Sequence, residues 1–115
     1  MHELSISEGI LQAALSAPGA TRENLRAFHI RVGALSSASP QALEFCMGLV
    51  LEQNGMAEAQ VRIETAPARA RCECGHEGEI ENLFDGCPRC GSFNRDILEG
   101  RDVTLQSIEV ENGQD

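Results

Sequence analysis

The sequence of 115 residues contains no lysine, tryptophan or tyrosine, and its only aromatic residues are four phenylalanines. The core must therefore be built mostly from Ala, Leu, Ile and Val. All nine basic side chains are arginine, and 18 acidic ones outnumber them to give a formal net charge of −9. Binding to a phosphate backbone needs a basic surface, and single strands need aromatic platforms. This composition therefore argues against a nucleic-acid partner.

Long apolar runs are also missing. No run approaches the roughly 20 apolar residues of a membrane span, and Met1-His2-Glu3-Leu4 opens the chain without the basic stretch of a secretory signal. We therefore expect no membrane association and a cytoplasmic location, in which the five cysteines remain reduced. Four of them crowd into residues 72–90. In a reducing compartment, such clustering favours metal binding over disulfides.

Apolar periodicity predicts two amphipathic helices. The first covers residues 5–16, where Ser5 and Glu8 have the spacing of a capping box. The second begins after Ser39, an expected N-cap followed by proline, and ends at Asn54-Gly55. Alternating apolar residues predict strands over 26–33, 61–64 and 103–110. The alternation slips midway through the last strand, which predicts a β-bulge.

The clustered cysteines form two pairs, Cys72/Cys74 and Cys87/Cys90, with twelve residues between them. Four thiolates brought together by two tight turns make a closed tetrahedral site, which is typical of structural Zn(II). Such a metal would also explain how a polar segment with few apolar side chains folds. The fifth cysteine, Cys46, lies on the apolar side of the second predicted helix and is interpreted as a small buried hydrophobe.

Glycine and proline support these turns. Gly75 and Gly91 directly follow the second cysteine of each pair, where a positive φ is expected to point backbone N–H groups at sulfur. Pro88 presets the turn of the second pair. The first pair is tighter than the usual two-residue spacing, so His76 is an alternative to Cys72 as the fourth ligand.

The first three residues have the chemistry of a compact chelator. Because His2 is large, Met1 is expected to be retained with a free α-amine. That amine, the His2 amide nitrogen and the His2 imidazole close adjacent chelate rings, and the Glu3 amide completes four nitrogens in a plane. This set suits Ni(II) or Cu(II) and not Zn(II), with the Glu3 carboxylate able to orient the imidazole. The alternative is a solvated terminal histidine.

Several motifs together resemble one known family. They are Met1-His2-Glu3-Leu4-Ser5, Arg31-Val32-Gly33-Ala34-Leu35-Ser36, Ala42-Leu43-Glu44-Phe45-Cys46 and the cysteine pairs ahead of a last strand. In order and spacing they resemble the HypA/HybF family of hydrogenase maturation nickel metallochaperones. The resemblance covers nearly the whole chain. One departure is Cys72, because many members have the first cysteine three positions before the second, where this chain has Arg71.

The resemblance implies an α+β fold, with two helices on a small three-stranded mixed sheet and an inserted zinc-ribbon-like zinc domain. Residues 1–68 and 100–112 would form the nickel-binding α/β domain, and 69–99 the zinc-binding insertion. His2 matches the family's nickel ligand, with Met1 and Glu3 beside it. Cys74, Cys87 and Cys90 match zinc ligands directly, and Cys72 follows with the one-residue shift.

The function implied is a carrier of Ni(II) that works with a partner maturation GTPase. The cargo would go to the large subunit of [NiFe]-hydrogenase, and in some organisms the family also serves urease. No nucleophile, base or oxyanion constellation is visible, so an enzyme is not predicted. The competing hypothesis is a zinc-ribbon interaction module with no transported metal. Such a scaffold would not depend on His2.

Overall fold

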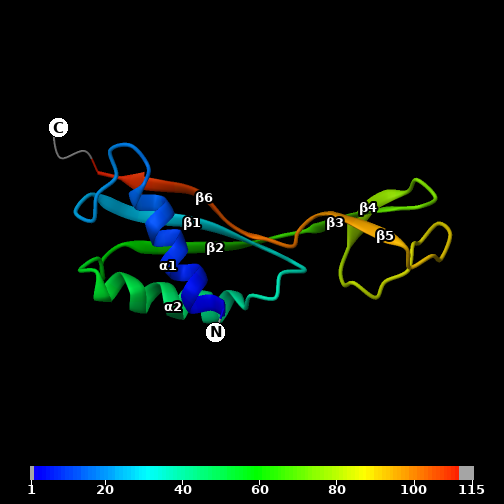
Figure 1. Ribbon diagram of the computed structural model, residues 1–115, viewed down its shortest axis with the longest axis horizontal. Coiled ribbons are helices and arrows are strands. Elements are labelled where there is room, and N and C mark those ends of the chain that lie inside the picture. The colour runs from blue at the N-terminus through cyan, green and yellow to red at the C-terminus, as the bar shows by residue number, and fades with distance from the viewer. Residues whose placement is uncertain (1, 112–115) are drawn as a thin grey trace.

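The computed structural model describes residues 2–111. The molecule is elongated, 57 × 30 × 17 Å, with a sheet at each end (Figure 1). Within the described residues, no helix is both long enough and apolar enough to cross a membrane. The elements along the chain are α1 (His2–Leu15), β1 (Leu25–Gly33), α2 (Pro40–Gln53), β2 (Gln60–Ala66), β3 (Ala68–Cys72), β4 (Glu77–Ile80), β5 (Arg95–Glu99) and β6 (Val103–Val110).

The larger sheet has the strand order β2-β1-β6 and is mixed, as predicted. Strand β1 runs parallel to β2, with α2 as the crossover between them, and antiparallel to β6. The expected bulge in the last strand is present, because His29 pairs with Ser107 whereas Ile30 pairs with Leu105. Strands β3 to β5 separate β2 from β6 in sequence. The segment that forms the second sheet is therefore inserted between two strands of the first sheet.

The main core lies between the larger sheet and the two helices. The inward residues of β1 alternate along the strand, and Phe28, Ile30 and Val32 are almost fully buried. The helices cover this face, α1 lying in front of the sheet in Figure 1. Together with Phe28, Ile30 and Val32, the core cluster contains Ile10, Leu11, Ala14, Leu25, Leu43, Met47, Val50, Leu51 and Met56. Phe28 is its only aromatic residue, so the core is largely aliphatic, as the composition predicted. Cys46, expected to be buried, is half-buried.

The smaller sheet has the order β4-β3-β5 and is entirely antiparallel. We call the segment 69–99 the cysteine ribbon. The apolar cluster at the smaller sheet consists of Ala68, Ala70 and Ile80, with Leu35 and Ile97 packed against it. Two alanines and an isoleucine bury little apolar surface, so the hydrophobic effect contributes far less here than in the main core.

The first helix begins at His2, which corrects the predicted start at Ser5. Ser5 and Glu8 lie inside α1 and do not cap it. Glu3 occupies the first turn, where the positive end of the helix dipole favours a carboxylate. Ser7 is buried, and its hydroxyl donates a hydrogen bond to the Glu3 carbonyl oxygen at 2.7 Å. Its burial therefore leaves no unpaired hydroxyl in the core.

The second helix follows its local signals. Ser39 is the N-cap, and its hydroxyl oxygen accepts a hydrogen bond from the Ala42 backbone N–H at 3.2 Å. Pro40 follows at the first helical position, where its missing N–H costs no intrahelical bond. The helix ends at Asn54 and Gly55, as predicted.

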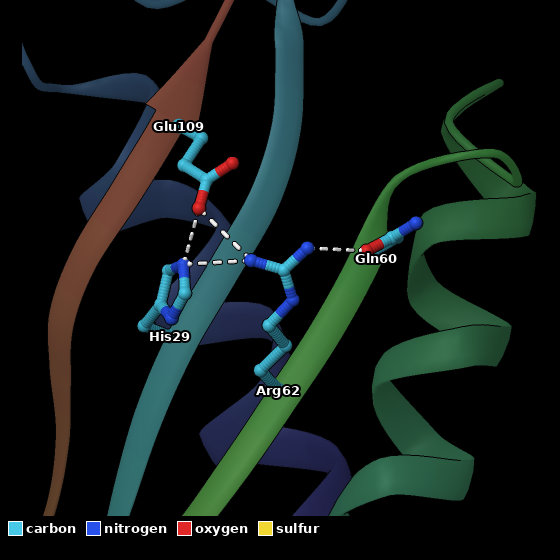
Figure 2. A network of polar contacts seen from close by, with 4 residues as sticks. All are labelled: His29, Gln60, Arg62 and Glu109. Carbon is cyan, nitrogen blue, oxygen red and sulfur yellow. Dashed lines mark hydrogen bonds and ion pairs between the residues drawn. The ribbon is translucent and has the colours of Figure 1, made fainter.

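The face of the larger sheet opposite the helices carries a polar network that joins all three strands (Figure 2). Glu109 on β6 accepts hydrogen bonds from His29 Nε2 at 2.7 Å and from Arg62 NH1 at 2.9 Å. Arg62 also donates to Gln60 at 2.6 Å. The hydrogen bond from His29, helped by the charge of Arg62, lowers the pKa of Glu109.

We expect Glu109→Gln to lower the melting temperature modestly at neutral pH. The folded pKa of Glu109 lies below its usual 4.5, so its charge stabilises the fold above that pH. The contribution is lost as pH falls through the lower folded value. Thermal melts from pH 7 downward should therefore show the two proteins converging in acid. Exposed Glu58, which lies in the loop before β2, supplies the control Glu58→Gln, and an equal loss in this control would contradict the assignment.

Candidate metal centres

The four clustered cysteines converge at the far end of the ribbon from the helices. Their Sγ atoms all lie within 4.8 Å of one another, and this is the one such group of potential ligands among the described residues. Cys72 Sγ lies 3.4 Å from Cys90 Sγ, and Cys74 Sγ lies 3.8 Å from Cys87 Sγ. The tight spacing of the first pair thus allows convergence. His76 is not part of the group.

These distances fit a tetrahedral metal–thiolate site. With metal–sulfur bonds of about 2.3 Å, tetrahedral Zn(II) requires sulfur–sulfur separations of about 3.8 Å. Cys72 and Cys87 are buried, whereas Cys74 and Cys90 are exposed. The site therefore lies half at the surface, with one buried thiol from each pair.

Backbone N–H groups prepare one of the thiols for ligation. Burial raises the pKa of Cys87, but hydrogen bonds from the backbone N–H groups of Cys90 and Arg89 outweigh it and lower the pKa to about 6. The Arg89 N–H lies 3.3 Å from Cys87 Sγ. At Cys72 the Cys74 backbone N–H acts to lower the pKa, but burial and competition from the other three thiols raise it to about 12. A metal ion would remove that competition by binding all four as thiolates.

The glycines have the expected conformation. Gly75 and Gly91 have positive φ values, 95° and 80°. Their own N–H groups donate to the carbonyl oxygens of Cys72 and Cys87, at 2.8 and 2.7 Å, and the N–H groups of neighbouring residues, such as Arg89, are directed at sulfur as expected. Each glycine therefore shapes its turn through the backbone, where a side chain would be strained.

A carboxylate between the first two cysteines ties the two turns together. Glu73 accepts hydrogen bonds from Ser92 Oγ at 2.8 Å and from Asn94 Nδ2 at 3.0 Å. The partners are about twenty residues downstream, so no local sequence pattern marks them. The bonds hold the Cys72 turn against the segment that follows Cys90, as outer contacts commonly do at metal sites.

The second candidate centre is the start of α1. His2 is exposed and Glu3 half-buried, and Met1 lies outside the described residues. The first N–H groups of a helix have no carbonyl partner within the helix. The Glu3 backbone N–H instead donates to the carboxylate of its own side chain, which helps to lower the pKa of that group.

Glu3 connects this helix start to that of α2. Its Oε2 accepts the Ser39 backbone N–H at 2.9 Å, and this bond is the main reason that the pKa of Glu3 is lowered. The sequence predicted Ser39 as a helix cap but not its contact with Glu3, since the two residues are 36 positions apart. The N-terminus lies beside the first turn of α2 and far from the ribbon tip (Figure 1).

We expect Glu3→Gln to weaken nickel binding about tenfold, a typical loss for an outer contact at a metal site. Glutamine has no negative charge, so its side chain accepts the hydrogen bond from the Ser39 N–H more weakly than the Glu3 carboxylate does. The first turn of α1 should therefore be less ordered. Competitive nickel titration measures the affinity, with Glu8→Gln on the same helix as the control. An altered nickel spectrum would instead assign the carboxylate itself as a ligand.

The fold and the cysteine cluster define a small α+β protein with a site able to hold a metal ion. Its sequence matches, over residues 1–110, the family described as "HypA: Hydrogenase/urease nickel incorporation, metallochaperone, hypA". The chain belongs to the HypA family, the nickel-incorporation metallochaperones of hydrogenase maturation, and is not an enzyme.

The relatives match nearly the whole chain. The hydrogenase maturation factor HypA of Acidithiobacillus ferrooxidans is 36% identical over 114 residues, covering 96% of this chain and 100% of that protein. The factor of Desulfatibacillum aliphaticivorans is 39% identical over 113 residues, covering 96% and 87%. The solution structure of the Ni metallochaperone HypA from Helicobacter pylori has a TM-score of 0.69 at 18% identity, covering 94% and 96%. That similarity shows a shared fold.

Proposed function

We propose that this chain binds Ni(II) at its N-terminus and, together with a maturation GTPase, delivers it to the large subunit of [NiFe]-hydrogenase. The observation that carries the proposal is the placement of His2 and Glu3 in the exposed first turn of α1. There the His2 side chain is exposed, so its imidazole is available to the cargo. In this proposal the Met1 amine and the amide nitrogens of His2 and Glu3 complete the ligand set.

The surroundings of this turn suit a carrier, which must also release its metal. The positive end of a helix dipole disfavours a bound cation. The Glu3 carboxylate offsets that effect, because the hydrogen bond from the Ser39 N–H lowers its pKa and so favours the anion. Planar nitrogen ligation leaves axial faces open to an incoming ligand, so nickel can leave by ligand exchange.

The ribbon has a separate role in this proposal. Cys72, Cys74, Cys87 and Cys90 hold Zn(II), and because the four thiolates close the coordination shell, the metal is structural. Residues 1–68 with 100–112 form the nickel-binding domain, and 69–99 form the zinc domain. Residue 112 lies outside the described residues. Support for the division comes from the two separate sheets and apolar clusters.

Nickel titration with the native N-terminus, followed by ultraviolet and visible absorbance, tests the function. We expect one Ni(II) per chain, bound in addition to zinc, with the weak yellow absorption of a planar low-spin complex. A chain that binds no nickel while it retains zinc would favour the zinc-ribbon scaffold. Transfer to the hydrogenase large-subunit precursor, with and without the GTPase, tests the delivery step.

A further inference from the structure

The two helices carry no positive charge. Lysine is absent from the sequence, and all nine arginines lie outside α1 and α2. The charged side chains of the helices other than His2 are four glutamates, Glu3, Glu8, Glu44 and Glu52. On the opposite face of the sheet, by contrast, Arg26, Arg31 and Arg62 each pair with a carboxylate. The helical face of the larger unit is therefore acidic.

This acidic face also exposes an aromatic side chain. Phe45 on α2 is 67% exposed, and Leu49, one turn later, is 38% exposed. Residues four apart lie on the same side of a helix, so Phe45 and Leu49 form one apolar edge, which we call the α2 edge. Glu44 and Glu52 flank it in sequence. Phe45 gains little from folding at this exposure, and exposed apolar surface rimmed by polar residues is a feature of binding sites.

The α2 edge lies near the N-terminal centre. Ser39 caps α2 and also binds the Glu3 carboxylate. Phe45 is six positions after Ser39, which corresponds to a rise of about 9 Å along the helix. In Figure 1 the start of α2 lies beside the N-terminus, and the helix runs along the border of the molecule. A protein seated on the edge would therefore contact the region that carries nickel.

We propose that the α2 edge is the docking surface for the protein that receives nickel. The matching surface on that partner is an apolar groove that accepts Phe45 and Leu49, bordered by arginine or lysine side chains that face Glu44 and Glu52. The inference rests on the proposed function, because it assigns the docking site that delivery requires. The exposed phenylalanine supplies the buried contact, and the glutamates supply steering and orientation.

Charge also argues against a second copy of this chain on the same surface. In a two-fold dimer the same patch meets itself, so Glu44 and Glu52 would face the glutamates of the other copy. Neither helix offers a cation to compensate them. Such like-charge contacts are unfavourable across an interface. A basic partner avoids this cost.

Binding to the apo large-subunit precursor of [NiFe]-hydrogenase tests the proposal. The nickel-loaded chain with its native N-terminus is titrated onto immobilised precursor by biolayer interferometry. We expect Phe45→Ala/Leu49→Ala to weaken the dissociation constant at least about tenfold. Phe84→Ala is the matched control, because Phe84 is 85% exposed on the ribbon, away from α2, and it should leave binding unchanged. Both variants must retain zinc and nickel.

The charges are tested separately through salt. Association of the wild-type chain should slow as ionic strength rises, and Glu44→Gln/Glu52→Gln should flatten that dependence. Glu77→Gln/Glu79→Gln, two exposed glutamates on β4, is the control of equal charge. A salt dependence that is unchanged in the Glu44/Glu52 variant and flattened in this control would assign steering to the ribbon and overturn the charge argument.

Other outcomes overturn the docking surface itself. The proposal is wrong if the wild-type chain does not bind the precursor, or if the Phe45/Leu49 variant binds as tightly as the wild-type chain. It is also wrong if Phe84→Ala loses as much affinity as the Phe45/Leu49 variant. A loss of binding to the GTPase alone would assign the edge to a different partner, and a wild-type dimer that the variant converts to a monomer would assign it to a second copy. Nickel titration of the same samples is independent, so failure of the proposed nickel site is seen separately.

Discussion

Replacing Cys87 and Cys90 together by serine should remove zinc completely and unfold the cysteine ribbon, while the larger sheet and both helices remain folded. Two of four thiolates would be lost, and the remaining pair cannot complete a tetrahedral shell. Metal analysis of the purified variant measures the zinc content. Amide hydrogen exchange, resolved by residue, shows which of the two sheets loses protection.

The expected asymmetry follows from the two cores. The apolar cluster at the smaller sheet contains just Ala68, Ala70 and Ile80, whereas the main core packs Phe28 among residues of both helices and β1. Structural zinc contributes on the order of 10 kcal/mol in small domains, far more than so few apolar side chains supply. Cys46→Ser, which changes a cysteine outside the cluster, should keep full zinc. Full zinc in the Cys87/Cys90 variant would contradict the site.

Metal analysis also tests whether Cys72 or His76 is the fourth zinc ligand. The Sγ atom of Cys72 lies in the cluster, whereas the side chain of His76 lies next to Gly78. We therefore expect Cys72→Ser to weaken zinc retention. Zinc kept in that variant, and lost when His76→Ala is added, would show that the imidazole replaces the missing thiolate.

How far the sequence predicts this structure depends on how local each signal is. The Ser39 cap and the bulge in the pairing of β6 each depend on a local pattern of neighbouring residues, and both were predicted correctly. The start of α1 was placed too late because the contact that orders Glu3 comes from Ser39, a distant residue. The bonds from Ser92 and Asn94 to Glu73 were missed for the same reason. Tertiary contacts have no local pattern.

The strands of the ribbon illustrate a second limit. β3 alternates small alanines with arginines, and β4 contains a glycine and two glutamates, so Ile80 is the only β-branched residue of the two strands. They form a sheet because the turns that bring the four cysteines together also align the backbones. Spacing of the cysteines predicted the ribbon, whereas propensity did not predict its strands.

The largest functional effect should come from the first residues of the chain. His2→Ala should abolish nickel binding and, with it, hydrogenase maturation, whereas zinc content and the melting temperature should remain unchanged. The side chain supplies the imidazole of the chelate and is exposed at the first position of α1, outside the core cluster. Nickel titration, metal analysis and thermal melts on one preparation measure these quantities together.

An N-terminal extension tests the same site without changing a side chain. A short tag converts the Met1 α-amine into an amide and removes one nitrogen from the plane, so nickel affinity should fall almost as severely as in His2→Ala. Lowering the pH should weaken binding to the native chain, because protons compete for the amine and imidazole nitrogens. The control is a tag of equal length at the C-terminus, which leaves the chelate intact. Undiminished nickel binding by the N-terminally tagged chain would contradict the terminal site, and the zinc-ribbon scaffold would then be the better account of this protein.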